Sequence, residues 1–225
     1  MIVGVTGCVG AGKSTVCRIL AARGWSVLDV DALVARLLDE SGVDKRALFA
    51  AAMTNGALRS RLTHELRPRV VRYVEEWAAQ LDRHGALECA LLFELGFQTR
   101  CAVTWCVTCS PAERRRRVEA RTTASAQHFA AIEAAQWSEA EKVARADVAL
   151  STEGPVSALE GRVVAALERV ERLEAHGNGK TRECMRDETL GETSTGVAAP
   201  PDFACGGGRR TVHFEFEYPG RGRLA

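Results

Sequence analysis

The sequence lacks any run of apolar residues that approaches the roughly 18–20 needed to cross a bilayer. It has no basic amino-terminal region followed by an apolar segment, which is the pattern of a signal peptide. Its formal net charge is only +1, so no broad basic field favours nucleic acid as a ligand. We therefore expect a cytoplasmic globular protein that binds neither membrane nor nucleic acid and that holds any anionic ligand through local groups.

The eight cysteines lack the pattern of a disulfide framework. In a chain without a secretory leader, thiols within apolar segments are expected to stay reduced. Cys106 and Cys109 form a CxxC pair, which can bind a metal or serve redox chemistry, but no second CxxC and no nearby histidine completes such a site. We favour buried strand cysteines at both positions, since cysteine is common in protein cores. Cys8, Cys17, Cys89 and Cys101 lie in apolar or nucleotide-binding-type segments too, and we expect reduced thiols there.

Short apolar segments alternate with helical patterns along most of the chain. With 225 residues and 46% hydrophobic content, the chain can bury one substantial core. The predicted strands are nearly all apolar and cover residues 2–6, 25–30, 86–95, 101–109 and 147–151. The predicted helices cover residues 13–23, 31–40, 45–53, 58–81, 111–122, 125–145 and 155–174. Apolar strands that alternate with helices predict an α/β fold, with a parallel sheet covered on both faces.

The character of the sequence changes after about residue 175. Residues 176–225 are rich in glycine, threonine and charge, and they lack helical periodicity. We predict a folded domain over residues 1–175 and a low-order, disordered tail over 176–225. Within the tail, residues 211–218 alternate in polarity as an added strand would.

The segment GCVGAGKS satisfies the pattern GxxxxGK[ST], between a predicted strand and a predicted helix. Glycines in such a loop let successive backbone N–H groups point at phosphate oxygens, and the positive end of the following helix adds to the attraction. Lys13 would reach the β and γ phosphates, Ser14 would ligate Mg²⁺, and Thr15 would assist at the α phosphate. The predicted nucleotide-binding residues are Gly7, Cys8, Val9, Gly10, Ala11, Gly12, Lys13, Ser14 and Thr15.

Two aspartates lie where the second predicted strand ends. Asp29 and Asp31 would share an edge of the sheet with the glycine loop, and ligands of open α/β sheets bind at that edge. One of them could accept the proton of a substrate hydroxyl. Alternatively, Asp31 only caps the following helix and Asp29 only solvates the strand end.

Further charged groups have two interpretations each. Glu88 and Glu94 flank the end of the third predicted strand, where a carboxylate could hold the water shell of Mg²⁺ or simply face solvent. The arginines 114–117 and Arg121 lie on one predicted helix, with Arg117 and Arg121 on the same face. Such a run is a solvated face in most proteins, but a kinase could use it to neutralise phosphate charge on closure.

Several segments together resemble the dephospho-coenzyme A kinase family. They are VTGCVGAGKSTV, LDVDALV, GVDKRAL, RLTHELRPRV, ALLFELGF, SPAERRRRVEART, AIEAAQ and KVARADVALSTEG, in the family's order over about residues 1–170. The resemblance implies a P-loop NTPase-type core, acceptor-binding helices over about 32–84 and a lid over about 111–140. It implies an enzyme that uses ATP and Mg²⁺ to phosphorylate the ribose 3′-hydroxyl of dephospho-coenzyme A, the last step of coenzyme A synthesis.

The resemblance also implies roles for single residues. Asp31 matches the catalytic aspartate, and Lys13 belongs to the phosphate-transfer site. Thr6, Arg46 and Glu94 become substrate-binding candidates together with Asp31, with Thr6 at the border of the ATP phosphate site. The resemblance places Arg117 and Arg121 at the lid arginines.

The sequence departs from the family pattern on the acceptor side. Only DESG, residues 39–42, separates the aspartate helix from GVDKRAL, where the family has a longer stretch. An HP pair appears as Arg67-Pro68, PLL as residues 90–92, and a late asparagine as Thr152. Two alternatives therefore stay open: another small-molecule P-loop kinase for nucleosides or nucleotides, or an ATP-binding regulatory protein without turnover. The sequence carries no signal of oligomeric state.

Overall fold

A computed structural model of the chain describes residues 1–40, 55–121 and 126–175. The predicted helix 45–53, Arg46 and the predicted tail 176–225 with its strand 211–218 lie outside these ranges. Within them the elements are, in chain order, β1 (Ile2–Thr6), α1 (Lys13–Ala21), β2 (Ser26–Asp29), α2 (Val30–Glu40), α4 (Gly56–Ala79), β3 (Gly85–Glu88), η1 (Phe97–Arg100), β4 (Val103–Thr108), α5 (Pro111–Arg121), α6 (Ala126–Ala135), α7 (Glu139–Arg145), β5 (Val148–Ser151) and α8 (Val156–Ala175).

The five strands form one parallel sheet in the order β2-β3-β1-β4-β5. The central strand β1 lies between β3 and β4, with Val5 opposite both Glu88 and Trp105. At the next pair, Asp29 lies opposite Glu88. Because all strands run the same way, the carboxyl ends of β1, β2 and β3 meet at one edge. The predicted α/β fold with a parallel sheet is confirmed.

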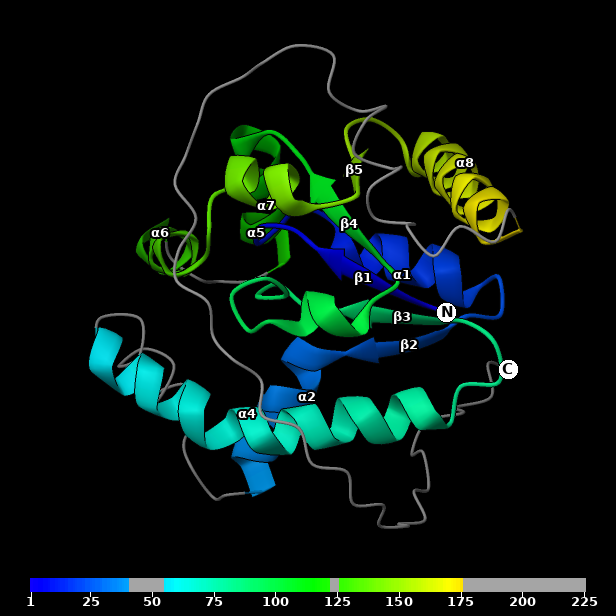
Figure 1. Cartoon of the computed structure of the whole chain (residues 1–225). Helices are drawn as coiled ribbons and strands as arrows, with labels where there is room; N and C mark the ends of the chain where they lie inside the picture. Colours follow the sequence, from blue (N-terminus) through cyan, green and yellow to red (C-terminus); the bar gives the residue numbers. More distant parts are fainter. Residues whose placement is uncertain (41–54, 122–125, 176–225) are drawn as a thin grey trace, which may run out of the picture. The chain divides into compact units, whose positions relative to one another are not determined.

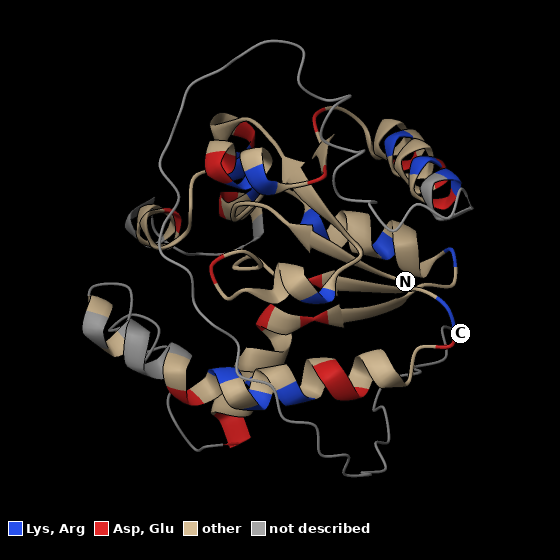
Figure 2. Cartoon of the chain, in the orientation of Figure 1, with Lys and Arg blue, Asp and Glu red and all other residues tan. Residues whose placement is uncertain are grey.

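Helices cover both faces of the sheet (Figure 1). Val3 and Val5 of β1 point into a core shared with α1 and α8, where they meet Leu20 and Val163. The opposite face packs on α2 and α4 in a second core, whose buried residues include Leu33, Leu37, Val70, Val74 and Leu87. Figure 2 shows charged residues mainly on the helices and at strand ends, while the strands themselves are largely uncharged. The nearly continuous apolar character of the strands therefore reflects burial on two sides.

The predicted strand 86–95 is too long. Strand β3 ends at Glu88, and residues 90–96 form turns, with Leu95 N–H donating to Leu91 O at 2.9 Å. The neighbouring strands end at Thr6 and Asp29, so no partner backbone continues the ladder beyond that point. The run stays apolar because Leu92 and Phe93 are buried in the turns, so its hydrophobicity indicates burial rather than strand.

The six described cysteines are buried and free, as expected for reduced core thiols. The described residues contain no group of three or more His, Cys, Asp or Glu side chains that could hold a metal ion. None of the helices in the described ranges is long and apolar enough to span a membrane. The cytoplasmic location stays a prediction.

Candidate active site

The glycine loop connects β1 to α1 at the carboxyl edge of the sheet. Helix α1 begins at Lys13 after Gly12, and no side chain caps it, so its amino-terminal end is available to an anion. The Lys13 ammonium group reaches back and donates to Gly7 O at 3.2 Å. The loop, the helix end and this lysine therefore have the arrangement that the sequence motif predicts.

Two glycines let the loop pack against its neighbours. Gly10 has a φ of 79°, and a Cβ there would lie 2.6 Å from Arg114 O on α5. A Cβ at Gly7 would lie 2.4 Å from Val107 O on β4. Both contacts are with backbone, which cannot yield as a flexible side chain can. The loop is therefore built directly on the strand and on the first turn of the predicted lid.

Ser14 and Glu88 form a hydrogen-bonded pair beside the loop. The Ser14 hydroxyl donates to Glu88 Oε1 at 2.7 Å. Burial raises the pKa of Glu88, and the hydrogen bond from Ser14 and the charge of Lys13 act in the opposite direction. A hydroxyl and a carboxylate are the oxygen donors that Mg²⁺ prefers, and Mg²⁺ commonly takes one or two protein oxygens beside phosphate oxygens and water. The Ser14–Glu88 pair fits Mg²⁺. Of the two glutamates considered in the sequence analysis, Glu88 is the one that accepts a hydrogen bond from Ser14.

The two strand-end aspartates have separate roles. Asp29 Oδ1 accepts from the N–H of Ala32 at 2.9 Å, so Asp29 caps α2. The expectation that Asp31 caps this helix is wrong, because the helix begins one residue earlier, at Val30, and Asp31 lies in its first turn. The Asp31 side chain is therefore free of capping, and its Oδ2 accepts a long hydrogen bond from Ala90 N–H at 3.4 Å.

The carboxyl group of Asp31 lies in a charged environment. Residue 31 reaches solvent, but the surrounding protein desolvates its carboxyl enough to raise the pKa, and the neighbouring Asp29 raises it further. Lys13 is the strongest opposing influence and lowers it. This coupling places the predicted catalytic aspartate within electrostatic reach of the phosphate-loop lysine.

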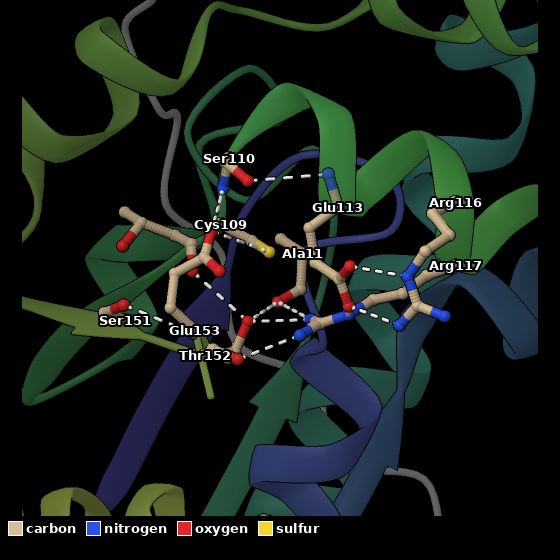
Figure 3. Close-up of polar contacts among 10 residues, drawn as sticks. Ala11, Cys109, Ser110, Glu113, Arg116, Arg117, Ser151, Thr152 and Glu153 are labelled. Atoms are coloured by element: carbon tan, nitrogen blue, oxygen red, sulfur yellow. Dashed lines mark hydrogen bonds and ion pairs between the residues drawn. The ribbon is translucent and has the colours of Figure 1, made fainter. Parts of the chain in front are cut away.

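Helix α5 lies against the phosphate loop through two of its arginines. Arg117 donates from Nη1 to Thr152 Oγ1 and from Nη2 to Thr152 O, both at 2.8 Å, and Thr152 Oγ1 donates to Ala11 O at 2.6 Å (Figure 3). Arg114 is buried and pairs with Glu133 at 2.7 Å. Arg116 is exposed and, with Arg117, holds the pKa of Glu113 down to about 2. The arginine run is therefore only partly a solvated face.

The remaining predicted site residues are distributed as follows. The Thr6 hydroxyl donates to Ala90 O at 3.2 Å, and Glu94 Oε1 accepts from Lys142 Nζ at 2.6 Å and from Trp137 N–H at 3.0 Å. Both side chains thus bind protein groups, and their substrate-binding roles stay predictions. Arg121 is the last residue of α5, but its side chain is outside the described part.

Three further residues at the site were not predicted. Thr152 fills the place of the family's asparagine and supplies the contacts to Ala11 and Arg117. Gln136 Oε1 accepts from Val9 N–H of the phosphate loop at 3.1 Å, and Lys142 is completely buried between α7 and the turns after β3. Only the match of their segments to the family hinted at these positions.

A sequence profile of the dephospho-CoA kinase family matches residues 1–43 and 34–157. The chain belongs to the dephospho-CoA kinase family. The dephospho-CoA kinase of Thermus thermophilus is 36% identical over 183 residues, which cover 74% of this chain and 90% of that protein. The dephospho-CoA kinase of Deinococcus radiodurans is 32% identical over 189 residues, with 75% and 91% covered.

Two solved structures match the fold of this chain. A crystal structure from Thermus thermophilus matches with a TM-score of 0.67 at 34% identity, covering 75% of this chain and 96% of that one. The dephospho-CoA kinase of Campylobacter jejuni matches with a TM-score of 0.54 at 18% identity, with 76% and 97% covered, which supports the fold.

The comparison also agrees with a shortened acceptor side. The alignment has 183 positions, but 74% of the 225 residues of this chain is fewer than 183. Some residues of the Thermus thermophilus protein are therefore aligned to gaps in this chain. The profile match is likewise split, with its two parts meeting at residues 34–43. The overlap of the two parts includes the DESG segment, residues 39–42, where the sequence is short.

Proposed function

We propose that this chain transfers the γ-phosphate of ATP to the ribose 3′-hydroxyl of dephospho-CoA. The proposal is supported by the position of Asp31 just after β2, at the carboxyl edge of the sheet where Lys13 and the phosphate loop follow β1, in a chain that belongs to the dephospho-CoA kinase family. Phosphoryl transfer needs the donor phosphate and the acceptor hydroxyl held together, and these two residues belong to the two sides of that pairing.

On the donor side, the loop amides and Lys13 hold the phosphates of ATP. Ser14 and Glu88 are the residues that would hold Mg²⁺. When bound there, the ion would supply positive charge against the phosphate oxygens. Arg117 contributes positive charge beside the loop at Ala11, and Arg121 is assigned the same role from the family match.

On the acceptor side, Asp31 orients the 3′-hydroxyl and accepts its proton at a carboxylate oxygen. The new O–P bond forms as the bond between the γ-phosphorus and the β–γ bridging oxygen breaks, and ADP is the leaving group. A carboxyl whose pKa is raised toward the working pH is a better proton acceptor than an ordinary one. Lys13 keeps the carboxylate form accessible by lowering the same pKa. Arg46 and the helical region over about 32–84 would bind the rest of the acceptor, and a lid over about 111–140 would close over the phosphates.

A substrate panel tests the proposal. The purified chain, with ATP and Mg²⁺, should convert dephospho-CoA to a product heavier by one phosphate, measured by chromatography and mass spectrometry. Phosphorylation of nucleosides or nucleotides with none of dephospho-CoA would instead support the other small-molecule kinase. Tight ATP binding without transfer to any acceptor would support the regulatory alternative, for which the short acceptor side is the motive.

We expect a chain ending at residue 175 to keep its activity. The family profile ends at residue 157, and the last described helix, α8, ends at Ala175. Leu159, Val163 and Val170 of α8 belong to the core, so the cut must come after this helix. The kcat and both KM values of the truncated chain should lie within about twofold of those of the full chain, a difference of no more than about 0.4 kcal/mol. Loss of activity with a folded core would show that residues 176–225 take part in the reaction.

A further inference from the structure

Lys142 on α7 is a lysine with no solvent exposure. Lysine is almost never fully buried unless its charge is paired. Its ammonium group donates to Glu94 Oε1 at 2.6 Å and to Ala90 O at 2.7 Å. Removing a charge from water costs several kcal/mol, and an ion pair in the interior recovers that cost only with very good geometry. A buried pair is therefore weak evidence for a role in stability.

The second contact of Lys142 leads to the active site. Ala90 lies in the turns that follow β3, beyond the last β1–β3 register pair at Glu88. Its carbonyl oxygen accepts from Lys142 and also from the Thr6 hydroxyl at 3.2 Å, while its N–H donates to Asp31 Oδ2 at 3.4 Å. Ala90 is thus held by Lys142 and Thr6 on one side and presents its N–H to Asp31 on the other.

We propose that Lys142 is a positioning residue for Asp31, which it holds through the backbone of Ala90. This inference rests on the proposed function, in which Asp31 accepts the proton of the acceptor hydroxyl. Anchoring the Ala90 carbonyl restrains this residue, whose own N–H, on the other side of its Cα, donates the hydrogen bond that orients the Asp31 carboxylate. Lys142 itself is buried and touches no substrate.

The charges around Asp31 give this role a measurable signature. They come from Lys13 on α1, Asp29 at the end of β2 and Lys142 on α7, while burial raises the pKa of the Cys89 thiol after β3 and keeps that group neutral. Lys142 lowers the pKa of Asp31, as Lys13 does more strongly. Replacing Lys142 by a neutral residue removes a lowering influence, so the pKa of Asp31 rises further. The base is then protonated at higher pH, and the acid limb of the kcat profile moves to higher pH.

The test compares Lys142→Met with the wild-type chain and with Arg172→Met. Methionine keeps the length of the lysine stem, and Arg172 is an exposed cation on α8 whose replacement removes the same charge far from the site. We expect Lys142→Met to lower kcat by about 10–100-fold, the range that a misplaced group can cost, with the KM for ATP within about twofold. The acid limb of its kcat profile should lie at higher pH than that of wild type. Arg172→Met should match wild type in kcat and in the position of the acid limb.

A double variant separates positioning from simple charge balance. Lys142→Met leaves the mostly enclosed Glu94 carboxylate without its cation, with the Trp137 N–H still donating to it, and this loss can destabilise the fold by itself. Lys142→Met with Glu94→Gln removes both charges and so remains testable if the single variant does not fold. A kcat deficit that persists in the folded double variant supports positioning through Ala90. Full recovery of kcat in the double variant, or an unmoved acid limb in a folded Lys142→Met protein, would overturn it.

A second measurement keeps this inference separate from the proposed function. Carbon-13 NMR can follow the titration of the Asp31 carboxyl, assigned by the signal that Asp31→Asn removes, without any substrate. A higher pKa of Asp31 in Lys142→Met supports the coupling even if dephospho-CoA is not the acceptor. An identical titration in both proteins would refute the positioning role whether or not the wild-type chain is a kinase.

Discussion

Replacing Asp31 by asparagine should lower kcat by about 10²–10⁴-fold, the usual contribution of an acid–base group. Asparagine has nearly the same shape, and its amide oxygen can still accept the hydrogen bond from Ala90 N–H. It cannot take up the proton of the 3′-hydroxyl. The KM for ATP should stay within about twofold, because the phosphate loop does not use this side chain. Steady-state kinetics with ATP and dephospho-CoA varied separately measure both effects.

The pH dependence of wild type follows from the environment of Asp31. The base works only when ionised, and burial raises the pKa at which it ionises. Activity should therefore fall as pH drops through this raised pKa, which lies above the usual range for aspartate. The same raised pKa means that the folded state binds the proton more tightly than the unfolded state, so this group stabilises the fold at low pH and loses that contribution as pH rises.

Asp29→Asn is the matched control for Asp31→Asn. Asparagine caps helices as well as aspartate does, so the cap of α2 should survive. The charge of Asp29 raises the pKa of Asp31, so its removal should lower that pKa. The acid limb of the kcat profile should then move to lower pH. A kcat loss in Asp29→Asn as large as that in Asp31→Asn, or an unchanged kcat in Asp31→Asn, would contradict the assignment of Asp31 as the base.

The sequence predicts the sheet and the phosphate loop well because both depend on local signals. Short apolar runs bounded by helical patterns allow few arrangements other than a covered parallel sheet. Glycines at fixed positions before Lys13 and Ser14 specify a loop whose backbone N–H groups can point into one concave site. These features need no knowledge of distant contacts, and β1, α1, β4 and β5 lie within a few residues of the predicted ranges.

The errors at the ends of elements have a common cause. Whether the apolar run after Glu88 continues as strand depends on whether β1 and β2 are long enough to pair with it, which the run itself does not encode. Which of Asp29 and Asp31 caps α2 depends on a shift of one residue in the helix start, and both residues are good caps by type. Local patterns decide that an element exists, and the partner decides where it ends.

The contacts that complete the site join residues far apart in sequence. Lys142 meets Ala90 across 52 positions, and Thr152 meets Ala11 across 141. Nothing in the local pattern of α7 distinguishes Lys142 from an exposed lysine, because its burial comes from the turns after β3. Thr152 stands out only as a departure from the family's asparagine. Such residues become visible once the fold has placed their partners.

Replacing Lys13 by alanine should remove most of the activity by a different route from Asp31→Asn. Its ammonium group is held over the loop by Gly7 O and would contact the β and γ phosphates. We expect kcat to fall by about 10²–10³-fold, as when one preorganised group that stabilises transition-state charge is lost. ATP binding should also weaken, in contrast to Asp31→Asn, since the same group contacts bound ATP before transfer.

A thermal shift separates the binding loss from the catalytic loss. A ligand at 100 times its Kd stabilises the folded state by about 2.7 kcal/mol, so MgATP should raise the melting temperature of wild type and of Asp31→Asn alike. The Lys13→Ala protein should show a much smaller rise at the same ATP concentration. Arg23→Ala removes a cation just after the far end of α1, where Arg23 contacts Ile19 O, and should keep the full rise.

The electrostatic role of Lys13 adds a second expectation that binding alone does not explain. Lys13 lowers the pKa of both Asp31 and Glu88, so its loss leaves two desolvated carboxyls with less opposing charge. The residual activity of Lys13→Ala should therefore have its acid limb at higher pH than wild type, even at saturating ATP. A full ATP-induced thermal shift together with an unmoved acid limb would mean that Lys13 neither contacts the phosphates nor supports the base. The loop and Asp31 would then not form one site.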